Sequence, residues 1–180
     1  MKHGNNNLFI LIAAMMVTVV AAACFSSDSG GFNGLTLAGR GLTMNVSDVQ
    51  KVDRMTYRDV DDLYYSVGPV TPGNDLVVAR VTIWNTRSGR LSLFVDQDAA
   101  TLESSDRESV FAINPYERRE ELGSAPPDLG RYTPLLWGPA DLPQDFNITG
   151  WMAFEVPEDW DIKVFEWEQV DFLKFPISVN

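Results

Sequence analysis

The chain has 180 residues, 45% of them hydrophobic, so it is long enough to bury the core of one domain. Its formal net charge is −11, and an acidic surface repels phosphates, which excludes nucleic acid as a partner. The single cysteine, Cys24, and single histidine, His3, exclude an intramolecular disulfide, Cys/His zinc sites, and Ser-His-Asp or Cys-His catalysis. We therefore expect neither an enzyme nor a bound cofactor.

Residues 1–23 have the layout of a secretory signal peptide. A weakly basic start at Lys2 is followed by an apolar run over 8–20 and three small alanines. The sequence Ala-Ala-Ala-Cys that ends at Cys24 resembles the lipobox of bacterial lipoproteins, although Ala21 replaces the usual leucine. We expect a signal helix, lipidation of Cys24, and anchoring to a membrane through that lipid. Secretion without lipid and an uncleaved membrane anchor are the alternatives, and all three place the domain outside the cytoplasm.

Residues 24–40 are rich in serine and glycine, which predicts a flexible tether. From residue 41 to residue 180, hydrophobic and polar residues alternate with period two, as in half-buried strands. The expected strands are 42–52, 75–85, 91–95, 100–103, 109–112, 146–156, 161–167 and 172–177, the last at a sheet edge because it contains Pro176. Residues 57–65 form a connection with a short strand or turn.

The run 75–85 predicts the central strand, because it is dense in β-branched residues and lies between two groups of turn-forming residues. Alternation places Val77, Ala79, Val81 and Ile83 on the face that makes the core. We expect 91–95 to form a hairpin with it, and 100–103 to form another with 109–112. In 161–167, alternation separates Ile162 and Val164 from a second face that carries Lys163, Phe165 and Trp167.

The stretch 115–145 differs from the rest, because six prolines interrupt regular structure there. It predicts a long irregular loop with one helical turn at 118–122. Loops on a rigid scaffold usually carry recognition, so we place partner binding here. The candidate binding surface consists of Tyr132, Trp137, Arg118 and Arg119, and we expect the two aromatic side chains to be exposed.

About seven or eight short strands with frequent turns predict an all-β fold, an immunoglobulin-like antiparallel β-sandwich over 41–180. The stretches 41–49, 76–85, 102–106 and 149–157 resemble the extracellular immunoglobulin-like domain of bacterial lipoproteins known as domain-of-unknown-function family 4352. The resemblance covers roughly residues 40–175. It implies the fold and an extracellular location, and the family carries no catalytic residues to transfer.

The sequence favours a bacterial cell-envelope lipoprotein with a non-enzymatic extracytoplasmic domain. Its expected partners are the membrane, through lipid on Cys24, and an envelope or extracellular protein. A carbohydrate- or Ca²⁺-binding domain is one alternative, because exposed aromatic rings stack on sugars and the acidic turns 59–62 and 158–161 supply oxygen ligands. A proteinase-inhibitor-like domain is another.

Overall fold

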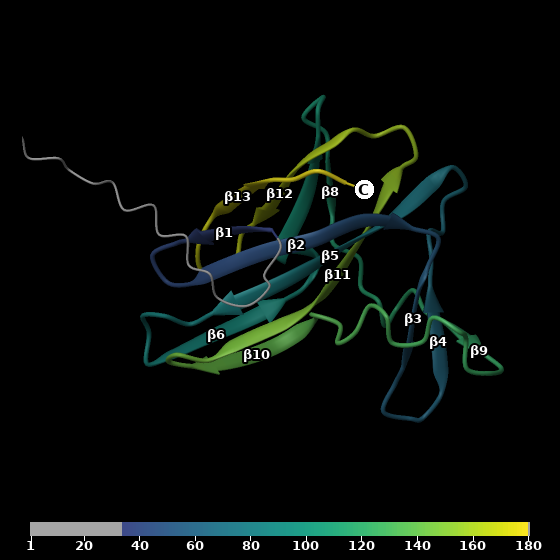
Figure 1. Ribbon diagram of the computed structural model, residues 1–180, viewed down its shortest axis with the longest axis horizontal. Helices are drawn as coiled ribbons and strands as arrows, with labels where there is room; N and C mark the ends of the chain where they lie inside the picture. Colours follow the sequence, from purple (N-terminus) through teal and green to yellow (C-terminus); the bar gives the residue numbers. More distant parts are fainter. Residues whose placement is uncertain (1–33, 180) are drawn as a thin grey trace, which may run out of the picture. The chain divides into compact units, whose positions relative to one another are not determined.

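The computed structural model describes residues 34–179, which form an almost entirely β-stranded domain with antiparallel sheets (Figure 1). The strands are β1 (Leu35–Ala38), β2 (Thr43–Val52), β3 (Met55–Arg58), β4 (Tyr64–Val67), β5 (Asn74–Trp84), β6 (Arg90–Val95), β7 (Ala100–Ser104), β8 (Ser109–Phe111), β9 (Glu120–Leu122), β10 (Gly138–Pro143), β11 (Asn147–Pro157), β12 (Ile162–Trp167) and β13 (Leu173–Pro176). One short 3-10 turn, η1 (Gln97–Ala99), is the only helical element of the described chain. Within the same range, no helix is long and apolar enough to cross a membrane.

Strand β5 lies inside a four-stranded sheet with the order β1-β2-β5-β11. Its β-branched residues favour an extended backbone. Its register with β11 pairs Asn74 with Pro157 at one end and Trp84 with Asn147 at the other. The side chains predicted to form its core face are all fully buried: Val77, Ala79, Val81 and Ile83. The prediction of a central strand with this inner face is confirmed.

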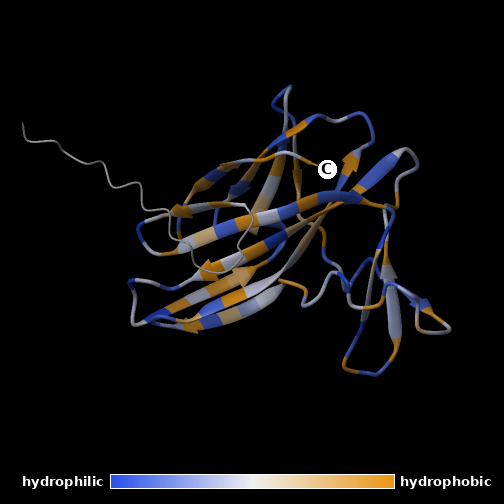
Figure 2. Cartoon of the chain, viewed as in Figure 1, coloured by the Kyte–Doolittle hydropathy of each residue, from blue (hydrophilic) through white to orange (hydrophobic). Residues whose placement is uncertain are grey.

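The main core lies between this sheet and two others, with the orders β13-β12-β7-β8 and β10-β6. Its largest members are Trp167, Phe154, Phe165 and Phe175, all fully buried. The ring of Phe165 packs edge-on against Phe154 and Phe175, with centroids 5.8 and 6.0 Å apart. Hydrophobic and hydrophilic residues alternate along many of the strands, as expected for sheets with one buried face (Figure 2).

A second, smaller core covers the opposite face of β5. The three-stranded sheet β3-β4-β9 supplies Tyr57 and Tyr65 to it, and β5 supplies Leu76 and Val78. Tyr132 belongs to the same core and attaches the surrounding chain to the sheet. The first half of β5 is therefore buried on both faces, and on its outer face only Arg80 is exposed.

Two predictions about strand pairing have opposite outcomes. The predicted hairpin of β7 with β8 is confirmed. The predicted hairpin of 75–85 with 91–95 is wrong, because β6 pairs with β10 instead of β5. The cause is the fully buried Asn85, whose Nδ2 donates hydrogen bonds to the carbonyls of Ser88 and, at 2.9 Å, Leu142 on β10. These bonds turn the chain away from β5 and towards β10.

The alternation predicted for 161–167 is wrong at its first residues. Strand β12 contains a β-bulge between Ile162 and Val164, and a bulge inserts one residue and shifts the faces. Ile162, Phe165 and Trp167 consequently all reach the main core. Strand β13 lies at the edge of its sheet, as predicted from Pro176.

The predicted segment boundaries need two corrections. The tether 24–40 ends earlier than predicted, because β1 pairs with β2. The loop 115–145 contains two strands: β9 replaces the predicted helical turn by pairing with β4, and β10 accommodates its prolines because it is paired on one side only. The described residues thus form thirteen strands instead of about seven or eight. The signal segment 1–23 and Cys24 lie outside the described residues.

Candidate functional site

The segment 127–135, between β9 and β10, lines three hollows in the surface of the domain. The Asp128 hollow has a volume of about 620 Å³ and is lined by Gln50, Lys51, Val52, Asp53, Arg54, Pro127, Asp128, Arg131 and Tyr132. The Tyr116 hollow has a volume of about 490 Å³ and is lined by Tyr57, Arg58, Asp59, Tyr116, Leu129, Gly130, Thr133, Pro134 and Leu135. The Arg80 hollow has a volume of about 350 Å³ and is lined by Arg80, Arg131, Thr133, Pro134, Thr149, Gly150 and Trp151.

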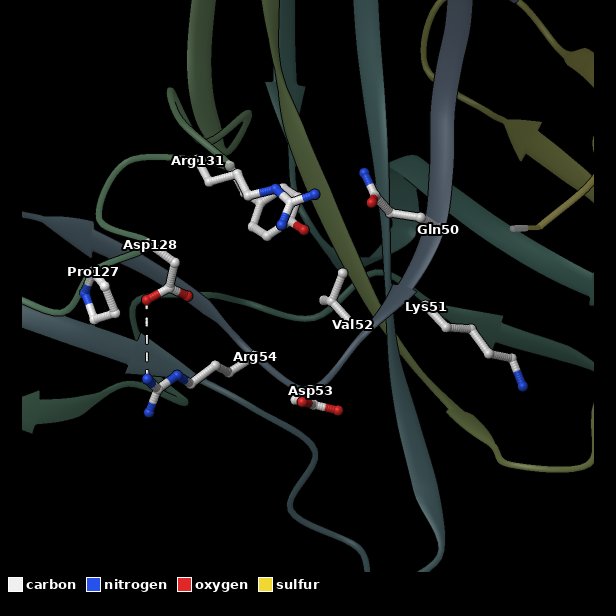
Figure 3. Close-up of a pocket in the computed structure, with 9 residues that line it drawn as sticks. Gln50, Lys51, Val52, Asp53, Arg54, Pro127, Asp128 and Arg131 are labelled. Atoms are coloured by element: carbon white, nitrogen blue, oxygen red, sulfur yellow. Dashed lines mark ion pairs between the residues drawn. The ribbon is translucent and has the colours of Figure 1, made fainter.

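The Asp128 hollow carries charges of both signs (Figure 3). The guanidinium of Arg54 lies 3.9 Å from Oδ1 of Asp128, which is too long for a hydrogen bond. That Oδ1 atom is buried and accepts no hydrogen bond from the protein. A buried carboxylate oxygen without a hydrogen-bond donor is costly, and the ion pair with Arg54 offsets part of that cost.

Arg131 lies between the Asp128 hollow and the Arg80 hollow and lines both. Its guanidinium carbon lies 5.2 Å from the centre of the Tyr132 ring, a cation–π contact. Tyr132 in turn packs edge-on against Trp151, with ring centroids 5.1 Å apart. This stack of side chains fixes where the guanidinium of Arg131 is presented.

The Arg80 hollow is built on the outer face of the sheet. Arg80 on β5 is directly opposite Trp151 on β11, so the two side chains lie on the same face. The chain at 134–136 runs beside β11: Trp151 N–H donates to the Pro134 carbonyl at 2.8 Å, and Leu136 N–H donates to the Trp151 carbonyl at 2.9 Å. Gly150 allows this approach, because a Cβ there would lie 2.8 Å from the Cβ of Leu136.

The structure separates the four predicted binding residues. The expected exposure of Tyr132 is wrong: the side chain is 4% exposed, because it fills the second core against Trp151. Trp137 is partly buried against the main core. Arg118 forms an ion pair with the nearly buried Glu155 at 2.6 Å, beside a different hollow.

Arg119 connects the segment after β8 to the β3–β4 hairpin. Its guanidinium forms an ion pair with Asp59 and lies 4.0 Å from the centre of the Tyr65 ring. The hydroxyl of Tyr57 and the carboxylate of Asp59 both raise the pKa of Arg119, so it remains charged. These contacts give Arg119 a structural role, because they hold β9 against β4.

Tyr65 has a shifted titration that can be measured. Its hydroxyl donates a hydrogen bond to the Asp61 carboxylate at 2.6 Å, which with burial raises the pKa of Tyr65 to about 12. Replacing Asp61 with alanine removes this acceptor, so we expect the pKa of Tyr65 to fall towards 10 in an ultraviolet titration of tyrosinate. Tyr65→Phe identifies the transition, and Asp62→Asn, which alters a carboxylate paired with Arg58, should leave it in place. A high-pKa transition that survives Asp61→Ala would contradict the assignment.

The carboxylates of the acidic turns point to separate partners. Asp59 pairs with Arg119, Asp61 accepts from Tyr65, Asp62 pairs with Arg58, and Asp161 pairs with Lys163. Among residues 34–179, no group of three or more His, Cys, Asp or Glu side chains is arranged to hold a metal ion.

No family model matches the chain, and a search of curated proteins found no match. In fold, the chain is similar to ycdA of Bacillus subtilis, described as a candidate lipoprotein, with a TM-score of 0.50 at 14% identity over 82% of this chain. The chain spans 39% of the length of ycdA. Two further crystal structures also align with the chain. The secreted protein MPT63 of Mycobacterium tuberculosis has a TM-score of 0.48 at 16% identity, covering 81% of this chain and 92% of MPT63. The yjhA protein of Bacillus subtilis has a TM-score of 0.49 at 13% identity, covering 82% of this chain and 97% of yjhA.

At these identities the likeness to ycdA shows the fold alone. It supports the predicted all-β class, and the antiparallel sheets confirm that class directly. The resemblance to family 4352 stays a prediction.

Sequence reasoning missed Arg80, Arg131 and Trp151 as residues that share a hollow. One signal was visible: Arg80 is the only charged residue in the run 76–84 and falls on the outer face. Its neighbours on that face depend on the register of β5 with β11 and on the path of 131–136, neither of which local patterns determine.

Proposed function

We propose that the chain is a bacterial cell-envelope lipoprotein, anchored through lipid on Cys24, whose immunoglobulin-like β-sandwich is a non-enzymatic binding domain outside the cytoplasm. The pattern of residues 1–24 supports the anchor. The fold agrees with this reading, because ycdA, which is similar in fold, is itself described as a candidate lipoprotein. Secretion without lipid and retention through an uncleaved signal segment are the competing locations.

The observation that carries the binding role is the grouping of three hollows around the segment 127–135. The segment is held by the packing of Tyr132 in the second core and by the backbone hydrogen bonds of 134–136 to β11. Side chains held in place before a ligand arrives lose less conformational entropy on binding. A rigid segment that presents charged groups and partly exposed aromatic rings is therefore suited to recognition.

The anchor predicts a change of location for a cysteine variant. With full-length chain expressed in a bacterium, we expect the wild type in the membrane fraction and Cys24→Ser in the soluble or secreted fraction. Mass spectrometry of the amino-terminal peptide should find acyl chains on Cys24. Ser27→Ala, a change three residues away, should fractionate as the wild type does. Membrane retention of Cys24→Ser with residues 1–23 still attached would instead establish an uncleaved anchor.

Binding by the 127–135 segment can be tested in the envelope with a photo-crosslinking residue. We expect crosslinked products from a probe at Leu129, which lines the Tyr116 hollow, and none from a probe at Arg107 on the β7–β8 turn. Equal products from both positions would show non-specific capture. Products from neither would remove the segment as the recognition surface, without bearing on the lipid anchor.

A further inference from the structure

The Arg80 hollow differs in charge from the chain that contains it. The chain has a formal net charge of −11, yet this hollow is lined by two arginines, Arg80 and Arg131, and by no acidic residue. Arg80 forms an ion pair with Asp48, whose carboxylate lies 3.8 Å from the guanidinium, too far for a hydrogen bond. Both arginines are exposed. The hollow is thus a local positive site on an acidic domain.

The guanidinium of Arg131 has no anionic partner within residues 34–179. Among those residues it makes no ion pair or hydrogen bond. Its polar interaction there is the cation–π contact with the Tyr132 ring. A guanidinium presents several N–H donors in one plane, in the geometry that matches a carboxylate. An anionic ligand would satisfy these donors at a position that the Tyr132–Trp151 stack already fixes.

The rest of the lining is suited to a sugar ring. Trp151 is partly exposed and offers a flat apolar surface. The Thr133 hydroxyl donates to the Gly130 carbonyl at 2.8 Å, which leaves its oxygen lone pairs free to accept. The Thr149 hydroxyl shares a single 2.9 Å hydrogen bond with Thr82 and keeps further capacity. Apolar surface beside hydroxyl groups fits the alternating C–H and O–H faces of a pyranose.

We propose that the Arg80 hollow binds a carbohydrate that carries a carboxylate, with Arg131 and Arg80 on the carboxylate, Trp151 against the ring, and the threonines on its hydroxyls. The volume of about 350 Å³ is within the range of small-molecule sites. A simple inorganic anion would use the arginines but neither Trp151 nor the threonines. This inference rests on the proposed binding function and gives it a ligand class.

Calorimetric titration of the full-length chain in a neutral, non-glycosidic detergent tests the proposal. The probes are tri-galacturonate, N-acetylneuraminic acid and N-acetylmuramic acid, with methyl-esterified tri-galacturonate as the uncharged match and inorganic phosphate as the simple anion. We expect saturable binding of at least one acidic sugar and none of the ester. Arg131→Gln and, separately, Arg80→Gln should each weaken it about tenfold or more, as the loss of a charge-assisted hydrogen bond implies. Added salt should also weaken it.

Arg107→Gln is the matched control, because it removes one exposed arginine from the opposite sheet, at the β7–β8 turn. It should leave binding unchanged, and all three variants should keep the melting temperature of the wild type within a few degrees. Absence of binding by every acidic sugar, equal binding of the ester, equal binding of phosphate, or insensitivity to both Arg131→Gln and Arg80→Gln would each overturn the proposal. If the probe at Leu129 still captures a partner, the proposed binding function survives that failure.

Discussion

Replacing Asp171 with alanine is expected to lower the free energy of unfolding by about 3 kcal/mol. The Asp171 carboxylate accepts hydrogen bonds from the N–H groups of residues 40, 41 and 42, at 3.0, 2.7 and 2.9 Å. Both Asp171 and Leu42 are buried, so alanine would leave donors of the β1–β2 turn without an acceptor. Each unsatisfied buried group costs about 1–3 kcal/mol. Denaturant unfolding at neutral pH measures the loss, and a change below about 1 kcal/mol would contradict this account.

Gly39 gives this prediction an internal check. A Cβ at position 39 would lie 2.3 Å from Oδ2 of Asp171, so Gly39→Ala alone should also destabilise the domain. Once Asp171 is alanine that oxygen is gone, and the same glycine substitution should cost much less. Gly89→Ala is the control, because nothing lies within 4 Å of a Cβ there. Fully additive losses in the double variant would contradict a direct contact between positions 39 and 171.

The contribution of Asp171 should also depend on pH. Burial alone would raise its pKa, but the three N–H donors outweigh burial, so the pKa of Asp171 lies below its ordinary value of 3.8. A carboxyl group whose pKa is lowered by folding stabilises the folded state above its unfolded pKa. The stability difference between wild type and Asp171→Ala should therefore be constant near neutrality and shrink as the pH falls below about 3.8. A difference that grew in acid would have the wrong sign.

The strands were predictable where a single period extends along the whole element. Along its pairing with β11, strand β5 keeps one alternation of side-chain faces without a register shift, so its inner face followed directly from the sequence. Strand β12 does not, because the bulge after Ile162 shifts the faces, and nothing local marks that bulge. Likewise, Asn85 has the composition of an ordinary turn residue, and only the position of Leu142 shows why the chain leaves β5.

The candidate site was predictable as a region and not as a set of residues. Prolines marked 115–145 as unusual, and the hollows do surround part of it. Tyr132 was expected to be exposed because it lies in the long loop 115–145, yet a tyrosine ring that reaches a second core is more stable buried there. That second core requires β3, β4 and β9 on one face of β5, which is a long-range arrangement.

Replacing Gly150 with alanine is expected to cost about 2–3 kcal/mol of unfolding free energy and to weaken sugar binding in the Arg80 hollow. The added Cβ would lie 2.8 Å from the Cβ and 2.9 Å from the backbone nitrogen of Leu136. The backbone of Leu136 cannot rotate away from the added Cβ as the end of a side chain could, so the segment 134–136 must move. Its two hydrogen bonds with Trp151, at 2.8 and 2.9 Å, would lengthen or break.

Hydrogen exchange distinguishes this local displacement from general unfolding. In Gly150→Ala, the amides of Leu136 and Trp151 should lose protection by a larger factor than amides in β12, which lies in a different sheet. Gly123→Ala is the matched control, because nothing lies within 4 Å of a Cβ at that position. If all amides lost protection equally, the substitution would act on the whole domain. If Leu136 kept its protection, the close approach would not position the segment, and Gly150 would have no part in shaping the hollow.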